Sequence, residues 1–149
     1  MKILFIDDEY EQALPVAEYL RFEDHEVTLI SVASDAFAYF QAHKNCIDII
    51  ILDVMMPVFE PDKILFDSHN NVAVAYSTGF SLYEKFEVEM PHKKCIPIIF
   101  FSARRDILEE RPDFERLERL NKIVILTKPI LIDELLKILS DIYDKNSDS

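Results

Sequence analysis

The chain lacks several features that mark whole classes of protein. It has a single glycine, Gly79, among 149 residues, so it holds neither a phosphate-binding P-loop nor a glycine-rich dinucleotide turn. Its two cysteines, Cys46 and Cys95, are too few and too far apart in sequence for a disulfide framework or a metal knuckle. We expect each cysteine to pack as a small apolar side chain. No apolar run approaches the roughly 20 residues that cross a membrane, so a membrane span is not expected.

Positive charge is also scarce. The chain carries 28 acidic against 16 basic residues, a formal net charge of −12. A surface of this sign repels phosphate backbones, so we expect no direct contact with nucleic acid. The stretch Met1–Asp8 runs from apolar residues straight into two acids without a small-residue cleavage site, which indicates a first strand and not a signal peptide. We therefore expect a cytoplasmic protein.

What the chain does have is a series of apolar runs rich in β-branched residues. Three of them are nearly continuous, as in strands that are buried on both faces of a parallel sheet. The run Glu26–Val32 alternates more, which suits an edge strand. The five runs are Lys2–Ile6, Glu26–Val32, Ile47–Leu52, Ile96–Phe101 and Lys122–Leu126.

Segments with helical spacing separate these runs. We expect Ser34 to be the N-cap of a helix that extends to Ala42. Pro15 lies within Glu9–Phe22, so we expect the first helix to start or to kink there. The other helical segments are Phe80–Val88, Arg104–Leu120 and Leu131–Tyr143. Strands and helices that alternate in this way predict a parallel sheet with right-handed crossovers and helices on both faces.

Polar side chains gather where the predicted strands end, at Asp7, Asp8, Asp53, Ser102 and Lys128. In such a sheet the ligand site lies at the carboxyl ends of the strands. Two carboxylates about 4 Å apart repel by roughly 4 kcal/mol at an effective dielectric constant near 20, so three in one cleft require cations. Lys128 supplies one cation, and a set of oxygen ligands suits Mg²⁺. A carboxylate beside two such cations can attack a phosphorus centre, which predicts a phosphoryl acceptor.

Four short motifs resemble the receiver domains of two-component response regulators. They are Ile6–Glu9, Leu52–Pro57, Phe101–Ala103 and Thr127–Pro129, in the order and at the strand ends typical of that family. Any one of them is a weak signal, but the four in register span almost the whole chain. The resemblance implies an α/β, flavodoxin-like (βα)5 fold, with a doubly wound five-stranded parallel sheet of strand order 2-1-3-4-5.

The resemblance also implies which residues accept the phosphoryl group and hold the metal. Asp53 would be the phosphorylated aspartate. Asp7 and Asp8 would hold Mg²⁺, or Mn²⁺ as the alternative ion, together with Asp53 and the backbone carbonyl of Met55. The donor would be a sensor histidine kinase or a histidine phosphotransfer protein. The output would be contact with a downstream protein effector, since no output domain is expected after the receiver.

Further residues are implied to read the phosphoryl group. Ser102 would be the switch hydroxyl, and Lys128 would pair with the phosphoryl group or with Asp53. The peptide bond between Lys128 and Pro129 would be cis. The family usually has an aromatic residue three positions before this lysine, where the chain has Ile125, so activation through an aromatic rotor is not expected.

The chain departs from the family a second time in its length. We predict a single receiver domain at 1–143 and a polar C-terminal tail at 144–149 that frays. An insertion at 58–77, after the third strand, adds about twenty residues to the usual length, and connections this long are usually functional or disordered. The insertion is either a lid or partner-recognition loop over the site or a passive excursion.

Two other functions compete with the receiver prediction. A phosphohydrolase with an aspartate nucleophile often has a second acid two residues later, but that position is Met55 here. A receiver-like adaptor would bind partners without phosphorylation, which Ile125 and the insertion leave open. We expect a phosphoacceptor and not an enzyme, apart from self-catalysed phosphotransfer and dephosphorylation.

Overall fold

The computed structural model describes residues 1–54, 56, 78–90, 95–102 and 123–147. The strands are β1 (Lys2–Ile6), β2 (Glu26–Ile30), β3 (Ile49–Asp53), β4 (Ile98–Ser102) and β5 (Ile123–Thr127). The helices within these ranges are α1 (Tyr10–Phe22), α2 (Ala33–His43), α5 (Thr78–Glu89) and α8 (Ile132–Ser147). The predicted helical segment Arg104–Leu120 and the predicted insertion 58–77 lie outside the described residues.

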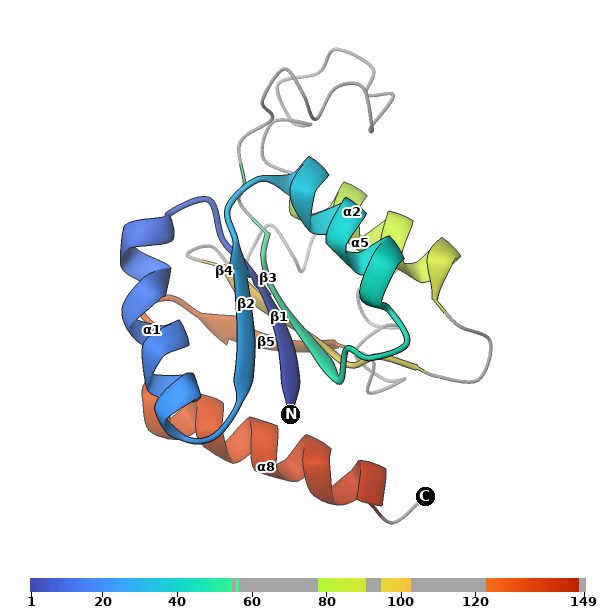
Figure 1. Ribbon diagram of the computed structural model, residues 1–149. Helices are drawn as coiled ribbons and strands as arrows, with labels where there is room; N and C mark the ends of the chain where they lie inside the picture. Colours follow the sequence, from blue (N-terminus) through green and yellow to red (C-terminus); the bar gives the residue numbers. More distant parts are fainter. Residues whose placement is uncertain (55, 57–77, 91–94, 103–122, 148–149) are drawn as a thin grey trace.

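The five strands form one sheet in the order β2-β1-β3-β4-β5, and all neighbouring strands are parallel (Figure 1). The predicted flavodoxin-like strand order and the edge position of β2 are therefore confirmed. Ile6 lies opposite Leu52 in the register, and Asp53 lies opposite Phe101. Because the strands are parallel and in register, their carboxyl ends reach the same edge of the sheet.

Helices cover both faces of the sheet, with α2 and α5 on one face and α1 and α8 on the other (Figure 1). Side chains alternate between the two faces along each strand. Ile50 and Leu52 therefore join the hydrophobic cluster under α2 and α5, whereas Ile49 and Ile51 join the cluster under α1 and α8. Burial on both faces is the reason why this strand reads as a continuous apolar run.

Helix α1 begins five residues before Pro15, where the sequence predicts a start or a kink. It starts at Tyr10 and has Pro15 inside it, so a helix start near Pro15 is wrong. A proline in this position removes one backbone hydrogen bond. The inner face of the helix nevertheless buries Ala13, Ala17 and Leu20. Packing against the sheet therefore outweighs the local penalty of the proline.

The predicted cap of α2 is also wrong. The helix begins at Ala33, so Ser34 lies inside its first turn and not at the N-cap. Val32 occupies the cap position with extended backbone angles and no capping hydrogen bond from its side chain. Ala33 and Ala36 are fully buried. Packing, and not a capping hydroxyl, therefore determines where this helix starts.

Helix α8 extends beyond its predicted end at Tyr143. It continues to Ser147, so the predicted polar tail at 144–149 begins inside the helix. The Ser147 hydroxyl donates to the Tyr143 carbonyl at 2.9 Å, and Lys145 lies in the last turn, where a cation interacts favourably with the helix dipole. Exposed polar residues therefore lengthen this helix beyond its predicted end.

The two cysteines are not packed as predicted. Both Cys46 and Cys95 are exposed. The isoleucine that follows each of them, Ile47 or Ile96, is buried in the cluster under α2 and α5. The apolar run therefore enters the core one residue later than we expected.

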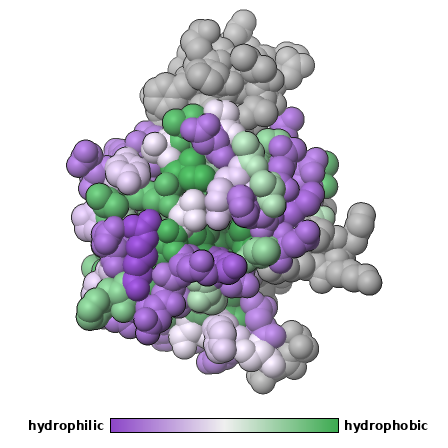
Figure 2. Space-filling model, viewed as in Figure 1, coloured by the Kyte–Doolittle hydropathy of each residue, from purple (hydrophilic) through white to green (hydrophobic). Residues whose placement is uncertain are grey.

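Hydrophilic residues cover much of the surface seen in Figure 2, with apolar patches between them. Large apolar side chains that stay exposed include Phe22, at the end of α1, and Leu131, just before α8. No helix in the described part of the chain has the length and apolar character to span a bilayer.

Candidate functional site

The candidate site is built at the carboxyl edge of the sheet. Asp7 and Asp8 follow β1, Asp53 is the last residue of β3, and Lys128 follows β5. The Asp7 amide donates to the carbonyl of Ile30 at 3.1 Å, which continues the pairing of β1 with β2 past the end of the strand. The buried runs determine where the strands end, and so they bring four charged residues from distant parts of the chain to one place.

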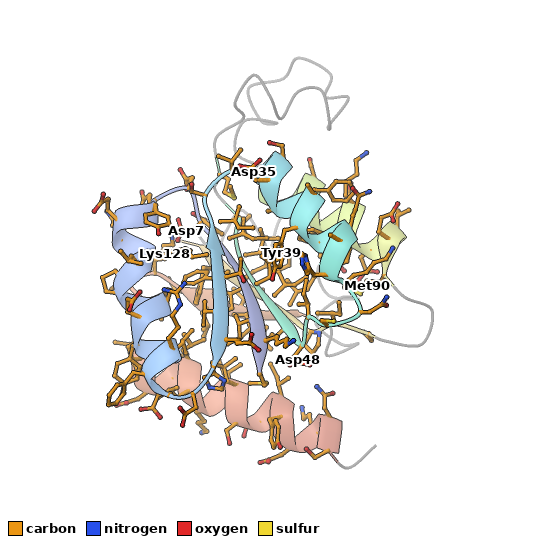
Figure 3. The ribbon with its side chains drawn as sticks, in the orientation of Figure 1. Asp7, Asp35, Tyr39, Asp48, Met90 and Lys128 are labelled. Carbon is orange, nitrogen blue, oxygen red and sulfur yellow. The ribbon has the colours of Figure 1, made fainter. Side chains whose placement is uncertain are left out.

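Lys128 contacts two of the acids directly. Its Nζ atom lies 3.1 Å from Oδ2 of Asp7 and 3.1 Å from Oδ2 of Asp53. Both carboxylates are buried, with 2% of Asp7 and 3% of Asp53 exposed. The side chains of Asp7 and Lys128 approach each other beside the N-terminal end of α1 (Figure 3). A lysine that bridges two buried acids is held in place by both of them.

Asp8 completes a cluster of three carboxylates. One oxygen from each of Asp7, Asp8 and Asp53 lies within 4.8 Å of the other two. Burial raises the pKa of Asp7, and the charge of Asp53 raises it further, while the Glu9 amide and Lys128 act in the opposite direction. Burial also raises the pKa of Asp8, against the effect of a hydrogen bond with Asp53. Burial is therefore the main reason why the pKa values of both acids are raised, and the charge of a neighbouring carboxylate adds to it.

The charge of Lys128 is itself secured by its partners. Burial by itself lowers the pKa of Lys128, but the carboxylates of Asp53 and Asp7 outweigh it, so the pKa lies above its ordinary value. The ammonium group is therefore charged at neutral pH. Among the described residues, three carboxylates therefore gather around one lysine.

The donor atoms of the cluster fit a hard divalent cation. All three groups offer carboxylate oxygens, which Mg²⁺ prefers, and Mg²⁺ usually takes only one or two protein carboxylates and keeps waters or phosphate oxygens. Burial raises the pKa values of Asp7 and Asp8, and neighbouring negative charge raises them further, so a bound cation would stabilise the ionised carboxylates. Met55, whose backbone carbonyl is a predicted ligand, lies outside the described residues.

The site opens into a hollow of about 670 Å³. Asp53 and Lys128 line it together with residues of α1 and of the segment before α8, namely Glu9, Gln12, Val16, Pro129 and Ile130. A cavity of this size admits a small ligand or a side chain of another protein. The carboxylate of Asp53 is therefore buried within the protein but accessible from one side.

The predicted site residues are placed as follows. Asp7, Asp8, Asp53 and Lys128 come together, and the peptide bond between Lys128 and Pro129 is cis. Ser102 ends β4, in register with Thr127 of β5. Ile125 is half-buried and packs against the cluster under α2 and α5. The roles of these residues stay predictions.

Sequence reasoning missed the walls of the hollow. Gln12 and Val16 lie on consecutive turns of α1, and Ile130 follows the cis peptide bond. The spacing of four residues between Gln12 and Val16 predicts that they share a helix face. That this face lines the hollow follows only from the position of α1 beside Lys128.

No family model matches the chain, and no curated protein matches it. Solved structures do match. The receiver domain of the hybrid histidine kinase CckA is 21% identical, with 95% of this chain and 98% of that chain covered and a TM-score of 0.63. The receiver domain of HemR from Leptospira biflexa is 20% identical, with coverage of 95% and 92% and a TM-score of 0.67.

A third match has the same character. The receiver domain of the Francisella response regulator 1452 is 21% identical, with 97% of this chain and 98% of that chain covered and a TM-score of 0.64. At identities this low, the similarity concerns the fold. The chain therefore has the fold of a response regulator receiver domain over almost its whole length.

Proposed function

We propose that this protein is a receiver of a two-component pathway and accepts a phosphoryl group onto Asp53. The observation that supports this function most is the arrangement of Asp53, whose buried carboxylate lies 3.1 Å from Lys128 and beside Asp7 and Asp8. A structural ion pair needs one acid for one lysine. Three acids around one lysine are costly for stability, so we attribute their presence to function.

The chemistry of the transfer is a displacement at phosphorus. A carboxylate oxygen of Asp53 forms a bond to the phosphorus atom of a phosphohistidine, and the bond from phosphorus to the imidazole nitrogen breaks. The electron pair of that bond leaves with the imidazole, which takes up a proton from solvent. Lys128 stabilises the phosphoryl oxygens by charge, because it already lies beside Asp53.

Mg²⁺ is the cofactor of this proposal, with Mn²⁺ as the alternative. Asp7, Asp8 and Asp53 would hold it, and when bound it would neutralise negative charge on the transferring group. Lys128 and the Glu9 amide hold the Asp7 carboxylate in place within this set.

The remaining roles belong to the same proposal. We assign the phosphoryl-sensing hydroxyl to Ser102, which ends the strand next to β3. Ile125 offers no aromatic ring to turn inward, so the signal leaves through other surfaces near the site. The donor is a sensor histidine kinase or a histidine phosphotransfer protein, and the output is contact with a protein effector in the cytoplasm, without nucleic-acid binding. The only catalysis is phosphotransfer and dephosphorylation at Asp53 itself.

The function is tested with beryllofluoride, which mimics a phosphoryl group on a carboxylate. Amide NMR spectra are recorded with and without Mg²⁺ for the wild type, Asp53→Asn and the matched control Asp35→Asn. Asp35 is an exposed acid in the first turn of α2, apart from the cluster (Figure 3). We expect Mg²⁺-dependent shifts around Ser102 and Lys128 in the wild type and the control, and none in Asp53→Asn.

The opposite result favours the receiver-like adaptor. If the wild type is folded and shows no response to beryllofluoride and Mg²⁺ together, Asp53 is not a phosphoacceptor. The protein would then use the receiver fold only to bind partners.

A further inference from the structure

The glycine of this chain lies against the backbone of the candidate acceptor. Gly79 is the second residue of α5. A Cβ atom placed on it would lie 2.5 Å from the carbonyl oxygen of Asp53 and 2.6 Å from the Cα atom of Val54. Real Cβ atoms essentially never approach other atoms within 3.0 Å, and both neighbours here are backbone atoms that cannot rotate away. No other amino acid fits at this position without a shift of α5 or of β3.

Backbone conformation does not account for this glycine. No glycine in the described residues has a positive φ, so an alanine would adopt the same angles. Within a helix, alanine is favoured over glycine by about 1 kcal/mol. The close approach to Asp53 and Val54 is therefore the reason for glycine at this position.

The two sides of this contact are each anchored elsewhere. On the α5 side, Leu82, Tyr83 and Phe86 are buried in the cluster that covers the sheet. On the strand side, the amide of Val54 donates to the carbonyl of Phe101 at 3.0 Å. Because neither partner is free to move away, an added methyl group would displace the peptide that carries the acceptor.

We propose that Gly79 is a positioning residue for the phosphoryl acceptor, through its contact with the backbone of Asp53 and Val54. The contact holds the end of β3 between α5 and β4, and so maintains the 3.1 Å approach of the Asp53 carboxylate to Lys128. This inference rests on the proposed function of Asp53. It adds a residue that acts through the backbone of Asp53 and Val54.

The expected effect follows from the sensitivity of transfer reactions to alignment. A displacement of about 1 Å lowers a rate by up to about 100-fold. We therefore expect Gly79→Ala to lower the rate of phosphorylation by acetyl phosphate at least about ten-fold, and to change the nitrogen chemical shift of the Lys128 ammonium in the unliganded protein. The matched control is Lys85→Ala, which introduces an alanine at an exposed position of the same helix.

The test combines the two measurements. Slow phosphorylation together with a shifted Lys128 signal in Gly79→Ala, and neither in Lys85→Ala, supports the positioning role. A folded Gly79→Ala protein with the wild-type rate and the wild-type Lys128 signal overturns it. If the wild type itself does not accept a phosphoryl group, the proposed function fails, while the Lys128 signal still reports whether Gly79 positions Asp53.

A measurement on the wild type decides the matter if Gly79→Ala does not fold. The contact predicts nuclear Overhauser effects between the Hα atoms of Gly79 and Val54, and a shift of the Gly79 amide on addition of beryllofluoride and Mg²⁺. The Lys85 amide should not shift. Absence of both Gly79 signals overturns the inference.

Discussion

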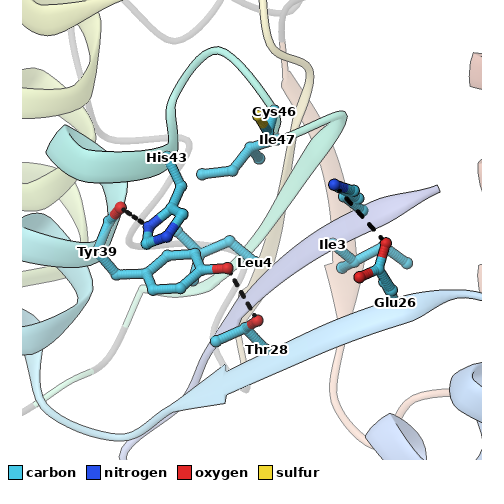
Figure 4. A pocket seen from close by; sticks show the side chains of 9 residues that line it. Ile3, Leu4, Glu26, Thr28, Tyr39, His43, Cys46 and Ile47 are labelled. Carbon is cyan, nitrogen blue, oxygen red and sulfur yellow. Dashed lines mark hydrogen bonds and ion pairs between the residues drawn. The ribbon is translucent and has the colours of Figure 1, made fainter.

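The two ends of the sheet use polar residues in opposite ways. At the amino end, a hollow of about 240 Å³ is lined by Lys2, Glu26, Thr28 and Tyr39 among others (Figure 4). Lys2 and Glu26 form an exposed ion pair at 3.9 Å, and the Thr28 hydroxyl lies 3.1 Å from the Tyr39 hydroxyl. These four polar side chains therefore form two pairs, of which the Lys2–Glu26 pair is exposed.

At the carboxyl end, the acids of the described cluster outnumber its one lysine. Asp7 and Asp53 are buried with one lysine between them, and Asp8 adds a third acid. Both ends have charged residues next to strand termini, so composition does not distinguish them. The difference is that a bound cation would stabilise the buried acids at the carboxyl end. Such an arrangement is typical of a metal site or a phosphoryl-transfer site.

The largest expected difference between the two ends is the cost of removing the lysine. We expect Lys128→Met to lower the free energy of unfolding by about 3 kcal/mol without divalent cations, because it leaves buried carboxylates unpaired. The control Lys2→Met breaks an exposed pair and should cost less than about 1 kcal/mol. Urea unfolding followed by circular dichroism measures both, and equal losses would contradict the contrast.

A smaller effect of opposite sign is expected for an acid of the cluster. Without divalent cations, Asp8→Asn should raise the free energy of unfolding by about 1 kcal/mol, because it removes a partly buried charge and its repulsion from Asp7. Mg²⁺ should stabilise the wild type and have little effect on Asp8→Asn. Thermal unfolding with and without Mg²⁺ checks this, with Asp35→Asn as the control. A destabilised Asp8→Asn protein would show that Asp8 has a structural role.

The raised pKa values of Asp7 and Asp8 predict the sign of a pH dependence. An acid whose pKa is higher in the folded state binds protons more readily there than in the unfolded chain. Its contribution to stability therefore rises as the pH falls through the folded-state pKa towards the ordinary value. We expect Asp8→Asn to gain less stability than the wild type between about pH 7 and pH 4 without divalent cations. Identical pH profiles would contradict the predicted shift of Asp8.

The smallest effect is expected at the amino end. Tyr39→Phe removes the hydroxyl that meets Thr28, which should cost about 0.5 kcal/mol and leave the response to beryllofluoride unchanged. Urea unfolding and the NMR titration test the two parts. A lost beryllofluoride response would mean that the two ends of the sheet are coupled.

These contrasts also show what sequence alone can predict. The buried runs reveal the strands, because burial on both faces leaves few alternatives to β-branched residues. Asp7, Asp8, Asp53 and Lys128 follow from the runs, since each stands where a strand ends. Local signals for helix ends were less reliable. Pro15 lies inside α1 and Ser34 inside α2, because tertiary packing outweighs a proline or a capping hydroxyl.

The sequence does not predict contacts between segments that are distant in the chain. The sequence of Gly79 and its neighbours does not predict its approach to Asp53, because that approach depends on how α5 packs on β3. The hollow beside Lys128 likewise needs α1 and the segment before α8 in their folded positions. Such features have no local pattern, because residues that are far apart in the chain create them.

The most direct test of the central claim locates the phosphoryl group by chemistry. The protein is incubated with acetyl phosphate and Mg²⁺ and then treated with borohydride, which reduces an aspartyl phosphate to homoserine. Mass spectrometry of the peptides identifies the reduced residue. We predict homoserine at position 53 in the wild type and none in Asp53→Asn. Unmodified wild-type protein, or homoserine at another aspartate such as Asp8, would contradict the assignment of Asp53 as the acceptor.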